Sequence, residues 1–276
     1  MEAKFVVRNG ELIEKDKACI SVYNKALFFD FAVYSNIKVT QGKMFLPELE
    51  IEKLFESADA LGIRHNFTKH KIIDFSKILI KEDNLKDALL RVLLIGQEKD
   101  AEPLLFIFPV GLTFYPDKYY NAGVKLVTYE GERFMPVSKS KNLLLNYLAY
   151  REAEKNNAID ALLVDKDKYI REGTRTSFFV VEGSDLIMPP REKVLEGVTR
   201  KIISEIARKI MDVKEEDIPL GRIKEYDEHF VTGTSIKVMP VRQIDNILLR
   251  EKVGDKVKEL QKLFKEHSDN NLSLND

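Results

Sequence analysis

The chain has 276 residues, 44% of them hydrophobic, which is enough to bury a core in one large domain or two modest ones. Lysine and arginine (44 together) nearly cancel aspartate and glutamate (45), so no bulk field favours nucleic acid or an anionic membrane. Cys19 is the single cysteine and cannot form an internal disulfide, which fits a reducing cytoplasm. The first residues lack a signal-peptide core and no window approaches 18 apolar residues, so we expect a cytoplasmic protein that does not enter a membrane.

Residues 1–115 are predicted to form an N-terminal α+β domain with an antiparallel sheet. Asn9-Gly10 is typical of a hairpin turn after the first strand. Pro47 suits the first turn of a helix whose apolar residues recur at helical spacing as far as Leu61. The expected strands are 4–8, 18–23, 33–39, 88–95 and 104–110, and the expected helices are 47–61 and 72–79.

Pro116, Asp117 and Asn121 interrupt these patterns, and we expect residues 116–123 to be an interdomain linker. Ligand sites favour domain interfaces, so the linker would lie beside the active-site cleft. Residues 124–267 would then form a C-terminal domain. The expected strands there are 124–128, 161–165, 169–172, 177–181, 214–219, 229–232 and 237–241, the expected helices are 144–153, 198–211 and 255–267, and the polar residues 268–276 are expected to be a disordered tail.

Three short motifs between Lys139 and Arg200 stand at strand ends and helix starts. They are a lysine that opens the run Lys139–Leu144, a glutamate followed by glycine at Glu172-Gly173, and Gly197–Thr199 at the start of a helix. A lysine amine can form a Schiff base with an aldehyde, and a carboxylate can hold a pyridine nitrogen protonated. A helix start offers free N–H groups and a positive dipole end to a phosphate. A pyridoxal phosphate enzyme needs these three groups.

Together with Val231–Ser235 and Met239–Val241, these motifs resemble, in order and spacing, the class IV (fold type IV) aminotransferases. That family includes branched-chain amino-acid aminotransferase, D-amino-acid aminotransferase and aminodeoxychorismate lyase. The resemblance implies a two-domain fold of mixed α+β and α/β structure, like that of D-amino-acid aminotransferase. It also implies that residues 124–267 bind pyridoxal 5'-phosphate, that the substrates are amino acids and 2-oxo acids, and that the protein is a homodimer.

By register, the resemblance makes Lys139 the Schiff-base lysine, and Lys141 is its local competitor. Most lysines in a protein are simply solvated, and residue type alone does not choose between these two. The resemblance makes Glu172 the partner of the pyridine nitrogen through a charge-assisted hydrogen bond. The plain alternative for Glu172 is a surface carboxylate in a Glu-Gly turn.

The resemblance implies that Val198 and Thr199 hold the phosphate at a helix start, with further donors from Thr234 and Ser235. The plain alternatives are a helix-capping hydroxyl and a polar turn between strands. Lys53 falls where the family usually places a phosphate-gripping arginine. Lysine keeps the charge but loses the planar fork, so an ordinary surface lysine on an amphipathic helix is an equal alternative.

Arg91 lies in an apolar strand, where an unpaired charge is costly, and it resembles the arginine that binds the substrate α-carboxylate in branched-chain aminotransferases. Its alternatives are an outward-facing arginine or a salt bridge. Tyr34 falls where the family has an aromatic lining of the substrate pocket, or it is a core residue. We expect no metal site, because the four histidines lack metal-ligand spacing.

Three departures from the family pattern concern the substrate pocket. The family's glycine-rich stretch is degraded to Phe28–Ala32, Ser35 replaces a usual glutamate, and Ser177 stands where asparagine is typical. The hypothesis is therefore an aminotransferase that moves an amino group between an amino acid and a 2-oxo acid such as 2-oxoglutarate, with branched-chain donors favoured because of Arg91. D-amino-acid aminotransferase and aminodeoxychorismate lyase are the alternatives within the family. A non-catalytic homologue that binds the cofactor or another ligand is the alternative of another class.

Overall fold

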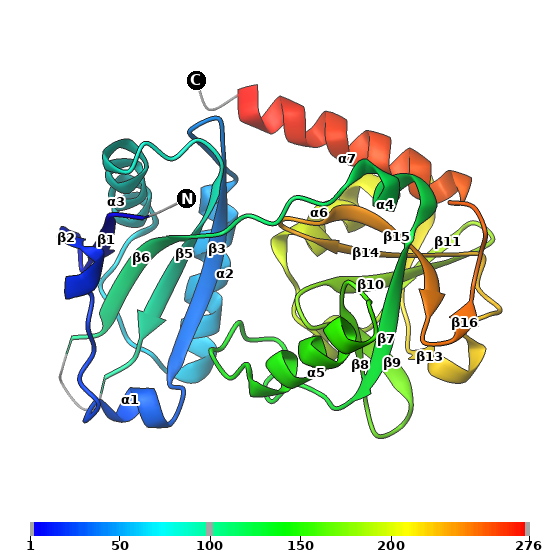
Figure 1. Ribbon diagram of the computed structural model, residues 1–276, viewed down its shortest axis with the longest axis horizontal. Coiled ribbons are helices and arrows are strands. Elements are labelled where there is room, and N and C mark those ends of the chain that lie inside the picture. The colour runs from blue at the N-terminus through cyan, green and yellow to red at the C-terminus, as the bar shows by residue number, and fades with distance from the viewer. Residues whose placement is uncertain (1–2, 98–101, 274–276) are drawn as a thin grey trace. The chain divides into compact units, whose positions relative to one another are not determined.

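The computed structural model describes residues 3–97 and 102–273. The chain divides into two compact units (Figure 1). The first comprises Met1–Leu112, Ser138–Asn142 and Ser268–Asp276, and the second comprises Thr113–Val137 and Leu143–His267. The short segment Ser138–Asn142 therefore belongs to the first unit, although the residues on both sides of it belong to the second.

Within the described residues, the first unit is built on a six-stranded antiparallel sheet with the order β2-β1-β6-β5-β3-β4. Its strands are β1 (Phe5–Arg8), β2 (Glu11–Glu14), β3 (Ala32–Thr40), β4 (Lys43–Phe45), β5 (Ala88–Ile95) and β6 (Leu104–Val110). Asn9 and Gly10 form the turn between β1 and β2, and both have the positive φ that a two-residue hairpin favours. The predicted hairpin turn is thus confirmed. The predicted strands 4–8, 33–39, 88–95 and 104–110 are confirmed as well.

Two helices, α2 (Pro47–Leu61) and α3 (Lys69–Glu82), pack against one face of this sheet. Pro47 opens α2 and Gly62 ends it with a φ of 72°, as a left-handed helix end requires. The smaller elements of the unit are η1 (Lys15–Lys17) and α1 (Lys25–Phe28). The helices and the sheet share one core, which includes Val33, Ile37, Ile51, Leu54, Ala58, Ile72, Leu79, Leu90 and Val92.

The second unit contains a sheet of ten strands among the residues described. Its hydrogen-bonded path runs β12-β11-β10-β14-β15-β7-β8-β9-β13, and β16 pairs with β15. Ser177 of β10 also pairs with Glu172 of β9, so the strands from β10 round to β9 form a closed ring. The strands are β7 (Val124–Glu130), β8 (Ala161–Val164), β9 (Tyr169–Gly173), β10 (Ser177–Glu182), β11 (Asp185–Met188), β12 (Asp212–Glu215), β13 (Ile218–Pro219), β14 (Glu228–Gly233), β15 (Lys237–Ile244) and β16 (Ile247–Leu248).

The helices of the second unit are α4 (Asp117–Ala122), α5 (Leu144–Lys155), α6 (Val198–Ala207) and the part of α7 (Asp255–Ser273) as far as His267, with short turns η2 (Arg191–Lys193) and η3 (Leu220–Arg222). Ile202, Ile203 and Ile206 bury one face of α6, as their helical spacing predicts. Glu228 on β14 accepts hydrogen bonds from two backbone N–H groups at the start of α7. That contact satisfies donors that the helix itself cannot pair.

Residues 18–23 form no strand, so that prediction is wrong. The Asn24 N–H donates to Ser21 O at 3.0 Å, and the Asn24 side chain accepts from the N–H of Ala26. These bonds close a turn and start α1, which competes locally with an extended strand.

Three further predictions also change. Residues 268–273, expected to be disordered, continue α7, because no glycine or proline occurs between 255 and 273 to end the helix. Residues 274–276 of the predicted tail lie outside the described residues. The stretch predicted as a linker contains α4, and the predicted strand 214–219 is divided between β12 and β13.

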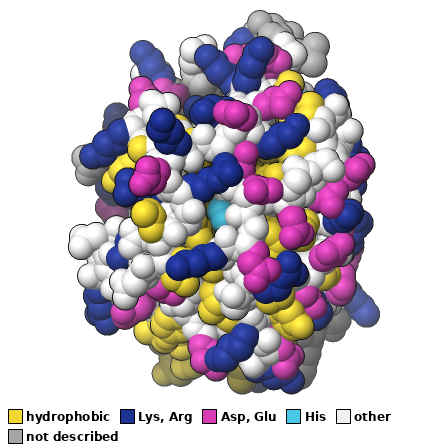
Figure 2. All heavy atoms as spheres, turned by 90° about the vertical axis from the view of Figure 1, so that its right-hand side faces the viewer, with side chains coloured by type: hydrophobic (Ala, Val, Ile, Leu, Met, Phe, Trp, Pro, Cys, Tyr) yellow, Lys and Arg dark blue, Asp and Glu magenta, His cyan; other side chains and the backbone are white. Residues whose placement is uncertain are grey.

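Basic and acidic side chains are interspersed on the face shown in Figure 2, in keeping with the formal net charge of −1. Among residues 3–97 and 102–273, no helix has both the length and the apolar character that a membrane crossing needs. In the same described part of the chain, no three His, Cys, Asp or Glu side chains gather as metal ligands.

Candidate active site

The backbone of Lys139 is held between a strand and a helix of the first unit. Lys139 O accepts a hydrogen bond from the N–H of Tyr34 on β3 at 3.0 Å. The Lys139 N–H donates to Ser57 Oγ on α2 at 3.0 Å. One residue further on, Ser140 forms a β-bridge with Val33. Contacts distant in sequence therefore fix the position of this lysine.

The two candidate lysines differ in burial. The side chain of Lys139 is 11% exposed and that of Lys141 is 39% exposed. Lys141 Nζ lies 2.8 Å from Asp30 Oδ1 in an ion pair. A covalent cofactor linkage needs an amine in a defined and protected place. Burial therefore favours Lys139 over its local competitor.

An acid that the sequence did not single out lies beside Lys139. Glu50 Oε2 on α2 is 3.5 Å from Lys139 Nζ, and the same oxygen accepts a hydrogen bond from Ser35 Oγ at 2.6 Å. Glu50 is 4% exposed. The available signal was its helical spacing with Leu54 and Ser57, because residues four and seven positions apart share one face of a helix.

Tyr34 and Arg91 lie close together on neighbouring strands of the first unit. The Arg91 guanidinium carbon is 5.0 Å from the centre of the Tyr34 ring, and Lys139 Nζ is 5.9 Å from the same ring. Arg91 Nε also donates to Asn36 Oδ1 at 3.2 Å. Among the described residues no carboxylate pairs with Arg91. A half-buried cation whose partners are neutral can bind an incoming carboxylate.

Lys53 has an ion pair of its own and a link to the lysine segment. Lys53 Nζ lies 3.1 Å from Glu56 Oε2, and the Lys53 side chain is 12% exposed. Its backbone oxygen accepts from Ser57 Oγ, the same hydroxyl that receives the Lys139 N–H. The Lys53 side chain is thus mostly buried and already paired with an acid. Its role in binding the phosphate stays a prediction.

Glu172 is a buried carboxylate on β9 of the second unit. It forms an ion pair with Arg133, whose Nη1 is 3.3 Å from Glu172 Oε1, and it accepts from the N–H of Leu195 at 3.3 Å. Burial raises the pKa of Glu172, and the charge of Arg133 opposes that rise. The sequence placed Glu172 at a strand end, but Arg133, in an irregular segment, gave no local signal of its role.

The predicted phosphate residues gather at the start of α6 and at the end of β14. Gly197 precedes α6 and offers no side-chain cap, so the first amides of the helix, at Val198 and Thr199, keep N–H groups without an intrahelical acceptor. Thr234 and Ser235 lie in the turn between β14 and β15 and are half-buried.

Several buried polar atoms of the same unit lack a partner among the described residues, and two of them lie within two residues of the predicted phosphate residues. These two are Arg200 Nη1, in the first turn of α6, and Thr232 Oγ1, on β14. Arg200 is 2% exposed, and its Nη2 donates to Pro189 O. Burial lowers the pKa of Arg200. Buried donors without acceptors are costly, and an anion bound beside the start of α6 would supply the acceptor that Arg200 Nη1 lacks.

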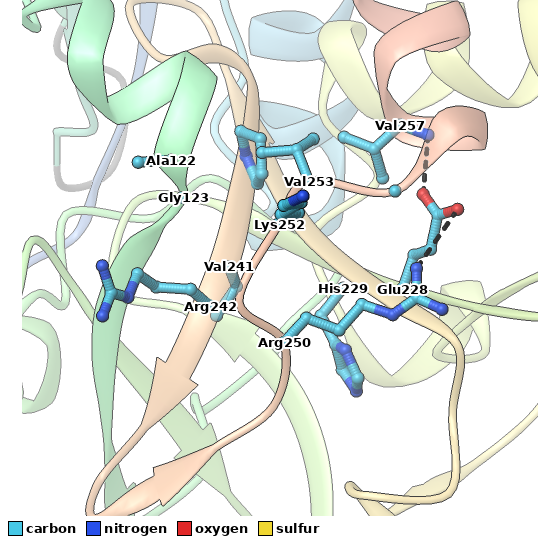
Figure 3. Close-up of a pocket in the computed structure, with 12 residues that line it drawn as sticks. Ala122, Gly123, Glu228, His229, Val241, Arg242, Arg250, Lys252, Val253 and Val257 are labelled. Carbon is cyan, nitrogen blue, oxygen red and sulfur yellow. Dashed lines mark hydrogen bonds and ion pairs between the residues drawn. The ribbon is translucent and has the colours of Figure 1, made fainter.

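A different hollow in the second unit lies between β14, β15 and the start of α7 (Figure 3). Arg242, Arg250 and Lys252 line it together with Glu228 and His229. Its volume is about 10 Å³, which admits roughly one water molecule. At that volume the hollow is far smaller than an amino acid.

Known proteins resemble the chain over nearly its whole length. A protein of Methanocaldococcus jannaschii, named as a branched-chain-amino-acid aminotransferase, is 28% identical and is matched over 94% of both chains. A D-alanine aminotransferase of Staphylococcus epidermidis is 28% identical over 94% of this chain and 96% of its own. The solved structure of the Escherichia coli branched-chain amino acid aminotransferase superposes with a TM-score of 0.85 at 22% identity, over 97% of this chain and 95% of that one.

The family model for class IV aminotransferases matches residues 32–244. The chain belongs to that family and is an aminotransferase with the fold of type IV enzymes, as the motifs predicted. Class IV aminotransferases are pyridoxal phosphate enzymes.

Proposed function

We propose that this aminotransferase uses pyridoxal 5'-phosphate to move amino groups between branched-chain amino acids and a 2-oxo acid such as 2-oxoglutarate. The name of the Methanocaldococcus jannaschii relative supports the donor class. Arg91 supports an amino-acid substrate, because its partners in the first unit are neutral and leave its charge for a carboxylate.

The residues present fit the cofactor. Lys139 supplies a buried amine for the aldehyde, and Glu172 supplies a buried carboxylate for the pyridine nitrogen. Val198 and Thr199, with Thr234 and Ser235, supply donors for the phosphate. The unpaired buried atoms at Arg200 and Thr232 support an acceptor from outside the chain in this region. When bound, the cofactor supplies an electron sink that acidifies the substrate Cα.

The residues of the chain bind and orient the substrate, and they move one proton. Lys139 would hold the cofactor through its amine, and that amine would take the proton from the substrate Cα as general base. Arg91 binds the α-carboxylate, and Tyr34, whose ring lies next to both cations, lines the pocket. Lys53 adds positive charge for the phosphate.

One observation carries the proposal. Lys139, which has the family's register, has a buried side-chain amine, and its backbone is held by hydrogen bonds to Ser57 and Tyr34. Borohydride reduction of the cofactor-saturated protein, followed by peptide mapping, should place the adduct on Lys139. L-Leucine, L-isoleucine or L-valine should bleach or shift the cofactor absorbance and support transamination of 2-oxoglutarate. An adduct on another side chain, or none, would overturn the mechanism, and colour that no donor changes would favour a non-catalytic binding protein.

A second candidate is transfer from D-alanine, because the Staphylococcus epidermidis relative of that name is matched over almost the same span at the same identity. A panel of L- and D-amino donors separates the two candidates. Conversion of D-alanine without conversion of L-leucine would make the second candidate the function of this enzyme. Formation of an elimination product from aminodeoxychorismate would identify the lyase.

The first unit also supports the proposal of a homodimer. Tyr23, Phe28 and Phe29, on and beside α1, are 90%, 73% and 77% exposed. Apolar surface of this kind is typical of a protein interface, and a second copy of the chain is the occupant that the family implies. Light scattering should give twice the monomer mass, and Phe28→Asp with Phe29→Asp should give monomers. Cys19 is free and exposed, which fits a cytoplasmic location.

A further inference from the structure

The acid beside Lys139 lies entirely within the first unit. Glu50 Oε2 is 3.5 Å from Lys139 Nζ, and Ser35 Oγ donates to the same oxygen at 2.6 Å. The side chains of Glu50 and Lys139 are 5% and 11% exposed, and Ser35 is fully buried. Among the described residues, Lys139 is the cation that pairs with Glu50.

Burial makes this pair mutually dependent. A carboxylate withdrawn from water stays ionised only if a cation or several donors compensate its charge. One serine hydroxyl is a single neutral donor, so the Lys139 nitrogen must supply the remaining compensation. In turn, the carboxylate is the opposite charge that lies 3.5 Å from that nitrogen.

We propose that Glu50 is a positioning residue that serves as the counter-ion of the Lys139 nitrogen. The inference rests on the proposed function, in which Lys139 carries the cofactor and shuttles the proton. When Lys139 Nζ takes the proton from the substrate Cα, Glu50 would stabilise the resulting ammonium. Glu50 itself neither gains nor loses a proton in this cycle. The hydrogen bond from Ser35 Oγ holds the Glu50 carboxylate in place.

The other charged and titratable groups near this nitrogen do not replace Glu50. Tyr34 presents its ring to Lys139 Nζ from β3, and Arg91 lies on the same ring from β5 with a charge that opposes an ammonium. On α2, Lys53 is paired with Glu56. Glu50 is thus the anion that the first unit directs at Lys139.

Glu50→Gln tests the proposal because it keeps the shape of the side chain and can still accept from Ser35, but it removes the charge. The full-length chain without added cofactor is treated with acetic anhydride between about pH 6 and about pH 10, and acetylation of Lys139 is measured by peptide mass spectrometry. An ammonium does not react, so loss of the counter-ion should raise acetylation near neutral pH by about tenfold. Exposed lysines provide the internal reference.

Two variants complete the test. Glu48→Gln, an exposed site on the same helix, should leave the Lys139 profile unchanged. Glu50→Asp keeps the charge one methylene further away and should give a smaller increase in the same direction, about threefold. If Glu50→Gln does not fold, the aspartate variant still tests the proposal, and a wild-type profile in it would overturn the role of Glu50.

The cofactor-loaded protein gives an independent readout. In Glu50→Gln, the pH midpoint of the visible absorbance change should fall by about one pH unit, because the anion that favours the protonated nitrogen is gone. If borohydride places the adduct on Lys139 but neither profile moves, the role of Glu50 is wrong and the proposed function stands. If no adduct forms on Lys139, the proposed function fails, and the acetylation profile still reports the ion pair.

Discussion

The buried histidine of the second unit predicts a specific loss of stability in acid. His229 on β14 is 4% exposed, and its Nε2 lies 2.7 Å from Ile223 O, so the neutral ring carries its proton on Nε2. Its Nδ1 has no partner among the described residues, and a proton there would be buried without an acceptor. Burial lowers the pKa of His229 from 6.5 to about 4.

The sign and size of the effect follow from that change in pKa. The unfolded chain binds the proton more readily than the folded chain, so the stability contributed by the neutral ring is complete above pH 6.5 and is lost as the pH falls toward 4. A fall in pKa from 6.5 to about 4 corresponds to roughly 3 kcal/mol of unfolding free energy. His229→Gln keeps a side-chain N–H for Ile223 O but cannot titrate.

The assay compares urea unfolding of the wild type and His229→Gln from pH 7 to pH 4, with hydrogen exchange of β14 amides to localise the effect to the second unit. The difference in unfolding free energy between the two proteins should change by roughly 3 kcal/mol in favour of the variant as the pH falls through this range. His70→Gln, at an exposed ring on α3, is the control and should run parallel to wild type. Parallel curves for His229→Gln would refute the assignment of the acid loss to this ring.

Three further predictions concern the site and the core of the second unit. Lys139→Ala should abolish the borohydride-trapped adduct and lower transamination by at least about 100-fold, whereas Lys141→Ala should keep both; equal losses would contradict the choice of Lys139. Arg133→Met leaves the buried carboxylate of Glu172 without its nearest cation and should cost about 3 kcal/mol at pH 7 by urea unfolding. Because burial already raises the pKa of Glu172, the loss should shrink as the pH falls and the acid takes up a proton, and a loss that does not vary with pH would contradict this reason. Phe230→Ala removes a fully buried ring and should lower the unfolding free energy by about 3–5 kcal/mol, and a loss below about 1 kcal/mol would show that the site collapses around the cavity.

Local patterns were sufficient for most of the fold. Hydrophobic periodicity located α2, and the Asn9-Gly10 turn located the first hairpin, because both depend on residues that are near in sequence. The predicted strand at 18–23 failed for the same reason: side-chain and backbone bonds around Asn24 start α1, and apolar composition alone did not reveal them.

The chemistry of the site was less accessible to local reasoning. The register of the lysine motif identified Lys139, but its hydrogen bonds to Tyr34 and Ser57 join residues about a hundred positions apart. Arg133 reaches Glu172 from an irregular segment that has no periodicity. Such pairings depend on tertiary structure, and single-residue patterns carry no information about them.

The departure at position 35 has a counterpart in space. The family pattern has a glutamate there, and this chain has Ser35, which on sequence alone removes an acid from the substrate region. In the first unit, Ser35 donates to Glu50, and the carboxylate of Glu50 lies 3.5 Å from Lys139 Nζ. An acid is therefore supplied to the lysine from α2 with the strand hydroxyl as its support. Ser35 and Glu50 should therefore be varied together as well as singly, because residues that share a hydrogen bond do not contribute additively.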